Sequence, residues 1–159
     1  MTRTYRVRHT CLLLLLAAFF GACSQSGDNN EAHQEASVTD SGSVPAGRFD
    51  LRYKIEGTGT PTIVIGSSIY YPRIFSQNLR EHLRFVFLDH RGFAPSPGPV
   101  DTMAFALDSI LDDVERVRQE LALGRIAVIG HSGHAFMALE YAKKYPENVS
   151  HVVMIGIAP

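Results

Sequence analysis

From residue 48 onward, short hydrophobic runs alternate with segments whose hydrophobic positions recur every three or four residues. Residues 49–55 alternate between apolar and polar, which predicts a half-buried strand. Four further runs are apolar nearly throughout and predict buried strands, at residues 62–65, 84–88, 126–129 and 151–157. Apolar strands separated by helices favour a mostly parallel sheet with helices on both faces, an α/β fold.

Three helices are predicted between these strands. One opens at Pro72 and continues through Phe75, Leu79 and Leu83. A longer one starts at Asp101, and a third spans residues 133–144. The longer helix carries an apolar stripe at helical spacing, formed by Leu107, Ile110, Leu111, Val114, Val117 and Leu121. Its opposite face, which includes Asp112 and Asp113, is expected to be solvated and to need no function.

The first 22 residues read as an export signal. Three arginines precede an apolar run over residues 11–22, which is too short to cross a bilayer comfortably. The end of the run, residues 20–23, resembles a bacterial lipobox, in which the signal is cut just before a lipidated cysteine. That resemblance implies that Cys23 is the lipid attachment site. The alternative is a plain secretory signal cut near Ala22, with Cys23 as an incidental thiol.

Residues 23–47 are predicted to be a flexible linker. From Ser24 to Gly47 the chain has no Leu, Ile, Phe, Tyr or Met, so it can bury little apolar surface. A tether of this kind suits a lipid-anchored protein of the bacterial cell envelope, with the membrane as a partner. Without lipidation the protein would be secreted or periplasmic.

Composition removes several function classes. With 15 basic and 16 acidic residues and a net charge of −1, the chain is not a polybasic nucleic-acid binder.

No group of residues has the ligand spacing of a zinc or calcium site, and no glycine-rich phosphate-binding motif occurs, so neither metal nor cofactor is expected. Cys11 would be removed with the signal, which leaves no cysteine pair for a disulfide.

The sequence Gly130-His131-Ser132-Gly133 lies between a predicted buried strand and a predicted helix. A serine at such a strand–turn–helix corner exposes its hydroxyl at the carboxyl edge of the sheet, as a nucleophile requires. The amides at the start of the helix can stabilise an oxyanion. The alternative is a serine that caps the helix, which would need the same residue type at the same place.

Four stretches together resemble the α/β-hydrolase family, which includes esterases, epoxide hydrolases and prolyl iminopeptidases. They are residues 63–68 (IVIGSS), 88–96 (LDHRGFAPS), 128–134 (VIGHSGH) and 138–156 (ALEYAKKYPENVSHVVMIG). The likeness covers residues 49–159, so residues 48–159 are expected to form the N-terminal portion of such a domain. The sheet is then expected to stop after about the sixth strand of the family.

The resemblance implies that Ser132 is a catalytic nucleophile acting on a small-molecule ester, amide or similar carbonyl compound. It also implies two backbone donors for the oxyanion, the N–H of Gly133 and the N–H of Ser68 (or Ser67).

The chain departs from the family pattern at two positions. Gly66 stands where the family usually has histidine, and His134 stands where it usually has glycine. We expect His134 not to be the catalytic base, because its side chain should point away from the corner. His90 reads as a loop and surface residue, and Tyr71 either lines a substrate pocket or packs against the helix start.

A serine hydrolase also needs an acid and a histidine, which the family places after the nucleophile. Only 27 residues follow Ser132, and none is aspartate. The triad is therefore expected to be incomplete in this chain, and activity would require an acid and a histidine from elsewhere. The alternative function is a truncated, catalytically inert lipoprotein or a binding module. Residues 151–157 are expected to form an exposed apolar edge.

Overall fold

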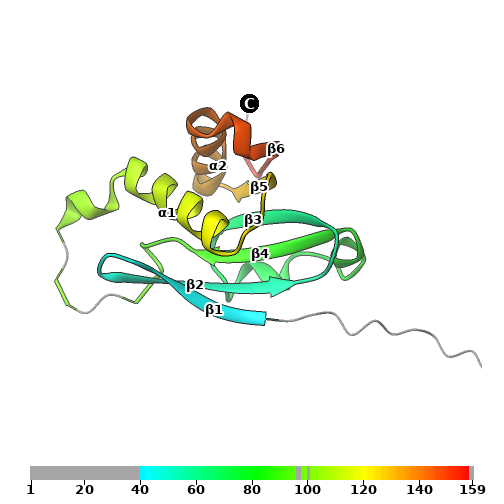
Figure 1. The fold of residues 1–159 in the computed structure, drawn as a ribbon, viewed down its shortest axis with the longest axis horizontal. Helices are drawn as coiled ribbons and strands as arrows, with labels where there is room; N and C mark the ends of the chain where they lie inside the picture. Colours follow the sequence, from blue (N-terminus) through cyan, green and yellow to red (C-terminus); the bar gives the residue numbers. More distant parts are fainter. Residues whose placement is uncertain (1–39, 96–97, 100, 158–159) are drawn as a thin grey trace, which may run out of the picture. The chain divides into compact units, whose positions relative to one another are not determined.

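The computed structural model describes residues 40–95, 98–99 and 101–157. Its six strands form one sheet with the order β1-β2-β4-β3-β5-β6 (Figure 1). They are β1 Asp40–Ala46, β2 Phe49–Glu56, β3 Thr60–Gly66, β4 Leu83–Asp89, β5 Ile126–His131 and β6 Val149–Ile155. The neighbours β4, β3, β5 and β6 run parallel, whereas β1 and β2 pair antiparallel. The predicted mostly parallel α/β sheet is confirmed.

In the part of the chain that the structure describes, two α-helices and four short 3-10 segments connect the strands. They are α1 Leu107–Glu120, α2 Gly133–Lys144, η1 Tyr71–Arg73, η2 Asn78–Glu81, η3 Thr102–Phe105 and η4 Pro146–Asn148. The prediction of α2 has the observed bounds. The helix expected from Asp101 begins later, because Asp101 caps η3 through a 3.0 Å bond from the Met103 N–H, and α1 follows only at Leu107.

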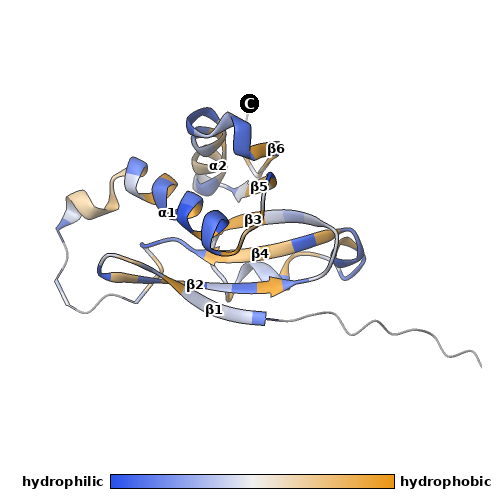
Figure 2. Cartoon of the chain, viewed as in Figure 1, coloured by the Kyte–Doolittle hydropathy of each residue, from blue (hydrophilic) through white to orange (hydrophobic). Residues whose placement is uncertain are grey.

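The sheet has a separate hydrophobic cluster on each face. On one face, α1 and α2 pack through Leu111, Val114, Val117, Ala138 and Tyr141 against the strands. On the other face, Val64, Phe85, Phe87 and Ile129 pack with Tyr71 of η1 and with Phe75. Figure 2 shows hydrophobic residues along β4 and hydrophilic residues on the outer side of α1. Both α-helices therefore cover one face, and the segment that carries η1 and η2 covers the other.

The linker prediction is wrong for its last residues. Residues 40–46 form the edge strand β1, which pairs with β2 from Asp40 opposite Ile55 to Ala46 opposite Phe49. Only Val44 and Ala46 of this strand are buried. An edge strand needs few apolar residues because its backbone hydrogen bonds to a single neighbour, so composition alone could not reveal it. The earlier part of the linker, the export signal and Cys23 lie outside the described residues.

The helix predicted from Pro72 is also wrong, because the structure has only η1 and η2 there. The buried Arg80 donates to the carbonyl oxygens of Pro72, Phe75 and Ser76 at 2.6, 2.7 and 3.0 Å. Its Nε donates to Glu56 at 2.7 Å. A guanidinium thus binds the carbonyls that a continuous helix would pair with backbone N–H groups.

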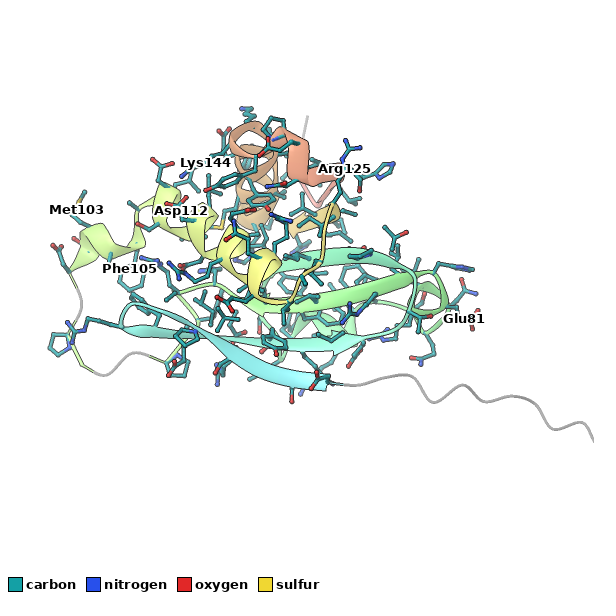
Figure 3. All side chains as sticks on the ribbon, viewed as in Figure 1. Glu81, Met103, Phe105, Asp112, Arg125 and Lys144 are labelled. Carbon is teal, nitrogen blue, oxygen red and sulfur yellow. The ribbon has the colours of Figure 1, made fainter. Side chains whose placement is uncertain are left out.

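The two adjacent aspartates of α1 have different environments. Asp112 is exposed and accepts from Lys144 at the end of α2 at 2.6 Å (Figure 3). Asp113 is 2% exposed and binds Arg91 through two 2.7 Å hydrogen bonds. The expectation that both are solvated is therefore wrong for Asp113, which holds the loop after β4 against α1.

Strand β6 forms the other edge of the sheet and pairs with β5. Its side chains alternate in exposure, with Val153 40% and Ile155 36% exposed. Val153 lies opposite Ile129, which belongs to the cluster on the face away from the α-helices. The expected exposed apolar edge is thus present in the described part of the chain. Within that part, no helix is long and apolar enough to span a bilayer.

Candidate active site

The carboxyl ends of three neighbouring strands bring the chemically reactive residues together. In the sheet, Gly66 at the end of β3 lies opposite Asp89 at the end of β4, and Ile65 lies opposite Gly130 in β5. The loops that follow these strands therefore leave the same edge. This is the edge at which open α/β sheets place their ligands.

Ser132 occupies the turn between β5 and α2 in a strained conformation. Its φ is 55° and its ψ is −126°, a region that residues other than glycine seldom adopt. Its N–H donates to the carbonyl of Ile155 at 2.8 Å, which fixes the turn to the end of β6. Although Ser132 is at the N-cap position, its side chain makes no capping hydrogen bond and is exposed. The capping alternative therefore does not explain this serine.

Gly130 permits the close approach of α2 to β5. A Cβ at this position would lie 2.0 Å from the carbonyl oxygen of His134, so any side chain would displace the first turn of the helix. The backbone of His134 thus makes the close contact and its side chain does not. A histidine fits in the motif position usually held by glycine because its ring leaves toward the loops after β3 and β4, as its contacts with Tyr71 and His90 show.

The N–H of Ser68 already donates a hydrogen bond within the protein. It donates to Oδ1 of Asp89 at 2.6 Å, and the other carboxylate oxygen accepts from Nε of Arg52 at 2.9 Å. Asp89 is 1% exposed, so this bond is shielded from water. The expectation that Ser68 offers a free oxyanion donor is therefore contradicted by its hydrogen bonding, and of the two serines only Ser67 remains a candidate. Asp89 serves to hold this loop in place.

The position of Gly66 is explained by Tyr71. The φ of Gly66 is +146°, and a Cβ there would lie 2.2 Å from Cε2 of Tyr71. The Tyr71 ring is 5% exposed and packs edge-on against the rings of His131 and His134, at centroid distances of 6.2 and 6.0 Å. Tyr71 therefore lies beside the end of β3 and next to the residues that flank the Ser132 corner.

Tyr71, His134 and His90 are joined by hydrogen bonds. The Tyr71 hydroxyl lies 3.1 Å from Nδ1 of His134, and Nε2 of His134 lies 3.1 Å from Nε2 of His90. Nδ1 of His90 accepts from the N–H of Gly92 at 3.0 Å. His90 is only 8% exposed, so the expectation of a surface residue is wrong. Among the described residues, neither ring is bonded to Ser132.

Burial keeps both histidines neutral. Burial, which is the largest cause, and the neighbouring His134 together lower the pKa of His90 to about 4, against the opposing effect of Asp89. Burial also lowers the pKa of His134, although a hydrogen bond with the backbone of His131 acts in the opposite direction. The same cause raises the pKa of the Tyr71 hydroxyl, which therefore keeps its proton.

Exposed apolar side chains lie in the segments that follow the three strand ends. Ile69 after β3, Phe93 after β4 and Phe136 in the first turn of α2 are 58%, 51% and 57% exposed. The Phe93 ring also lies 4.8 Å from the His90 ring and 6.0 Å from the His134 ring, measured between centroids. A separate hollow of about 490 Å³ beside β1 and β2 reaches Ser68 and Ile69, and Ser132 does not line it.

The sequence left Tyr71 as either a pocket-lining residue or a packing residue, and it gave no site role to His90. Both lie in the loops after predicted strands whose carboxyl ends meet the serine corner, and His134 already departed from its expected residue type. No group of three or more potential metal ligands occurs in the described residues.

Comparison with known proteins agrees with this geometry. Residues 58–159 match the model of the alpha/beta hydrolase fold family. The chain belongs to the α/β-hydrolase family. Its sequence is 50% identical over 111 residues to the AB hydrolase superfamily protein YclE of Bacillus subtilis, which covers 70% of this chain and 40% of that protein.

Other relatives support the same family. A proline iminopeptidase of Heyndrickxia coagulans is 30% identical over 115 residues, which is 69% of this chain and 40% of the relative. The crystal structure of the proline iminopeptidase-related protein TTHA1809 from Thermus thermophilus superposes with a TM-score of 0.62 at 25% identity, covering 72% of this chain and 44% of that one. This chain thus spans about 40% of the length of these two sequence relatives.

Proposed function

We propose that this α/β-hydrolase chain carries the nucleophile of a serine hydrolase, and that Ser132 is that nucleophile. The observation that carries the proposal is the strained φ of Ser132 at a corner where its side chain is exposed and caps nothing. Strain of about 1 to 3 kcal/mol persists only where the surrounding structure enforces it, and such sites are commonly functional.

The reaction would proceed by acyl transfer. The Ser132 Oγ attacks the carbonyl carbon of an ester or amide, a C–O bond forms, and the carbonyl oxygen becomes an oxyanion. The hydroxyl proton passes to a histidine base and then to the leaving alcohol or amine. Water releases the acyl group and restores the serine. The N–H of Gly133, in the first turn of α2, is proposed as one donor to the oxyanion.

We assign the acid and the base to residues other than the described histidines. His134 and His90 bond to each other, and His131 lies against Gly156, with its Nε2 3.0 Å from where a Cβ would be. The exposed Ile69, Phe93 and Phe136 favour a substrate with an apolar portion. Cys23 is proposed as the lipid anchor that holds the protein at the bacterial envelope.

Covalent labelling tests the nucleophile. We expect a fluorophosphonate to modify Ser132 and the Ser132→Ala variant to lose all labelling, as measured by intact mass and peptide mapping. Ser43→Ala, a change at an exposed serine of β1, should label like the wild type. Labelling that persists in Ser132→Ala would refute the site assignment. A wild-type protein that never labels would instead favour an inert lipoprotein or a binding module.

A further inference from the structure

The direction of the hydrogen bonds that end at Tyr71 can be worked out from one fixed donor. The backbone N–H of Gly92 can only donate, so Nδ1 of His90 accepts from it and carries no hydrogen. A neutral imidazole has one N–H, and therefore Nε2 of His90 carries the hydrogen. That group donates to Nε2 of His134 across 3.1 Å.

This donation determines which nitrogen of His134 carries the hydrogen, and then the role of the Tyr71 oxygen. Because Nε2 of His134 accepts, its Nδ1 carries the hydrogen and donates to the Tyr71 oxygen across 3.1 Å. The Tyr71 oxygen is thus an acceptor in its one hydrogen bond within the described residues. Its own hydrogen has no acceptor among them, even though the side chain is 5% exposed.

The position of Tyr71 suits a donor to reaction intermediates at Ser132. Its ring is packed against Gly66 at the end of β3 and edge-on to His131 and His134, the residues on either side of the corner. The loop after β3 is also where a second oxyanion donor is required. There the N–H of Ser68 is bound by Asp89, so it cannot serve.

We propose that the Tyr71 hydroxyl is a catalytic residue that donates a hydrogen bond to the oxyanion, opposite the N–H of Gly133. This inference rests on the proposed nucleophile. The Tyr71 proton stays on its oxygen throughout, and no bond to it is broken. Donation from His134 to the Tyr71 oxygen polarises the hydroxyl and holds it in one orientation. His134 and His90 are therefore positioning residues, which act through Tyr71.

Tyr71→Phe tests the proposal, because it keeps the ring beside Gly66 and removes only the hydroxyl. The assay uses the complete gene product. We expect Tyr71→Phe to lower kcat for a p-nitrophenyl ester about 10²- to 10³-fold and to leave KM nearly unchanged. The affinity for a trifluoromethyl ketone, whose adduct carries the oxyanion, should fall by a similar factor. A purely structural role would not couple these two losses.

Two further variants distinguish the loss of a hydrogen-bond donor from a folding defect. Tyr145→Phe removes a hydroxyl bonded at 2.6 Å to Asp112 and should leave kcat unchanged. Replacing Tyr71 with 3,5-difluorotyrosine keeps its shape but makes the phenol more acidic, so kcat should decline at high pH, where the hydroxyl is ionised.

The outcomes separate the two proposals. If Ser132 is labelled and Tyr71→Phe retains wild-type kcat and inhibitor affinity, Tyr71 is not the donor, and the Ser67 N–H takes its place. If Ser132 is never labelled in the wild type, both the nucleophile and the Tyr71 donor are overturned.

Discussion

At the scale of single residues, the buried His90 makes the stability of the fold depend on pH. Its pKa is about 4 in the folded protein, against an ordinary value of 6.5. Between these values the unfolded chain binds a proton that the folded chain does not. The free energy of unfolding must therefore decrease as the pH falls from about 6.5 to about 4. Burial lowers the pKa of His134 as well, which acts in the same direction.

This dependence predicts a measurable difference at pH 5. Each pH unit within the window is worth about 1.4 kcal/mol, so His90 should destabilise the protein by about 2 kcal/mol at pH 5 relative to pH 7. His90→Asn, whose amide oxygen can accept from Gly92, should lose this contribution in urea unfolding at the two pH values. His151→Asn, at an exposed position of β6, should unfold like the wild type. Equal pH dependence in all three proteins would contradict the neutral, buried His90.

The candidate site could be predicted from the sequence in part. The serine corner follows from glycines, a serine and their place between a strand and a helix, all of which are local features. The bond that occupies the Ser68 N–H was not predictable, because Asp89 lies 21 residues away and meets it only when β3 and β4 pair. The burial of His90 depends in the same way on His134, 44 residues further along.

At the scale of elements, hydrophobic pattern predicted the strands β2 to β6 and the helix α2, because each is defined by its own side chains. The hydrophobic pattern failed to predict elements whose local structure depends on polar contacts between residues far apart in the sequence. Arg80 replaces a helix with two short turns by binding three carbonyl oxygens and Glu56. Strand β1 exists because β2 offers it a partner, and its own sequence is mostly polar.

The ion pair between α1 and the loop after β4 should contribute strongly to stability. Asp113→Asn leaves the Arg91 guanidinium, whose side chain is 13% exposed, without a charged partner. We expect a loss of about 3 kcal/mol in the free energy of unfolding, measured by urea denaturation. The neighbouring Asp112→Asn breaks a pair in which the aspartate side chain is 58% exposed and should cost less than about 1 kcal/mol. Similar losses in the two variants would argue against a structural role for the Arg91 pair.

At the scale of the whole molecule, the described residues form a six-stranded α/β-hydrolase sheet that corresponds to about 40% of two relatives. The fold class and the family could be predicted because several motifs agree in type and order. The substrate could not be predicted, because the described residues offer only general features of a candidate site. These features are several exposed apolar side chains and one exposed serine between β5 and α2.

The proposed anchor concerns the molecule as a whole, because it decides where the site operates. We expect the protein expressed in a bacterium to incorporate labelled palmitate and to enter the detergent phase on Triton X-114 partitioning. Cys23→Ala should lose both properties, since a lipid-modified cysteine is the attachment point. Cys11→Ala should keep both, because that cysteine would be removed with the signal. Palmitate incorporation by Cys23→Ala would disprove the anchor.

The contact between Gly66 and Tyr71 has a consequence for evolution. A side chain at position 66 and an aromatic ring at position 71 exclude each other, because a Cβ would lie 2.2 Å from the ring. Homologues should therefore fall into two lineages, one with histidine at the first position and a non-aromatic residue at the second, the other with glycine and tyrosine. Intermediates that acquired only one of the two substitutions should be rare. Homologues that carry histidine at the first position together with tyrosine at the second would contradict this exclusion.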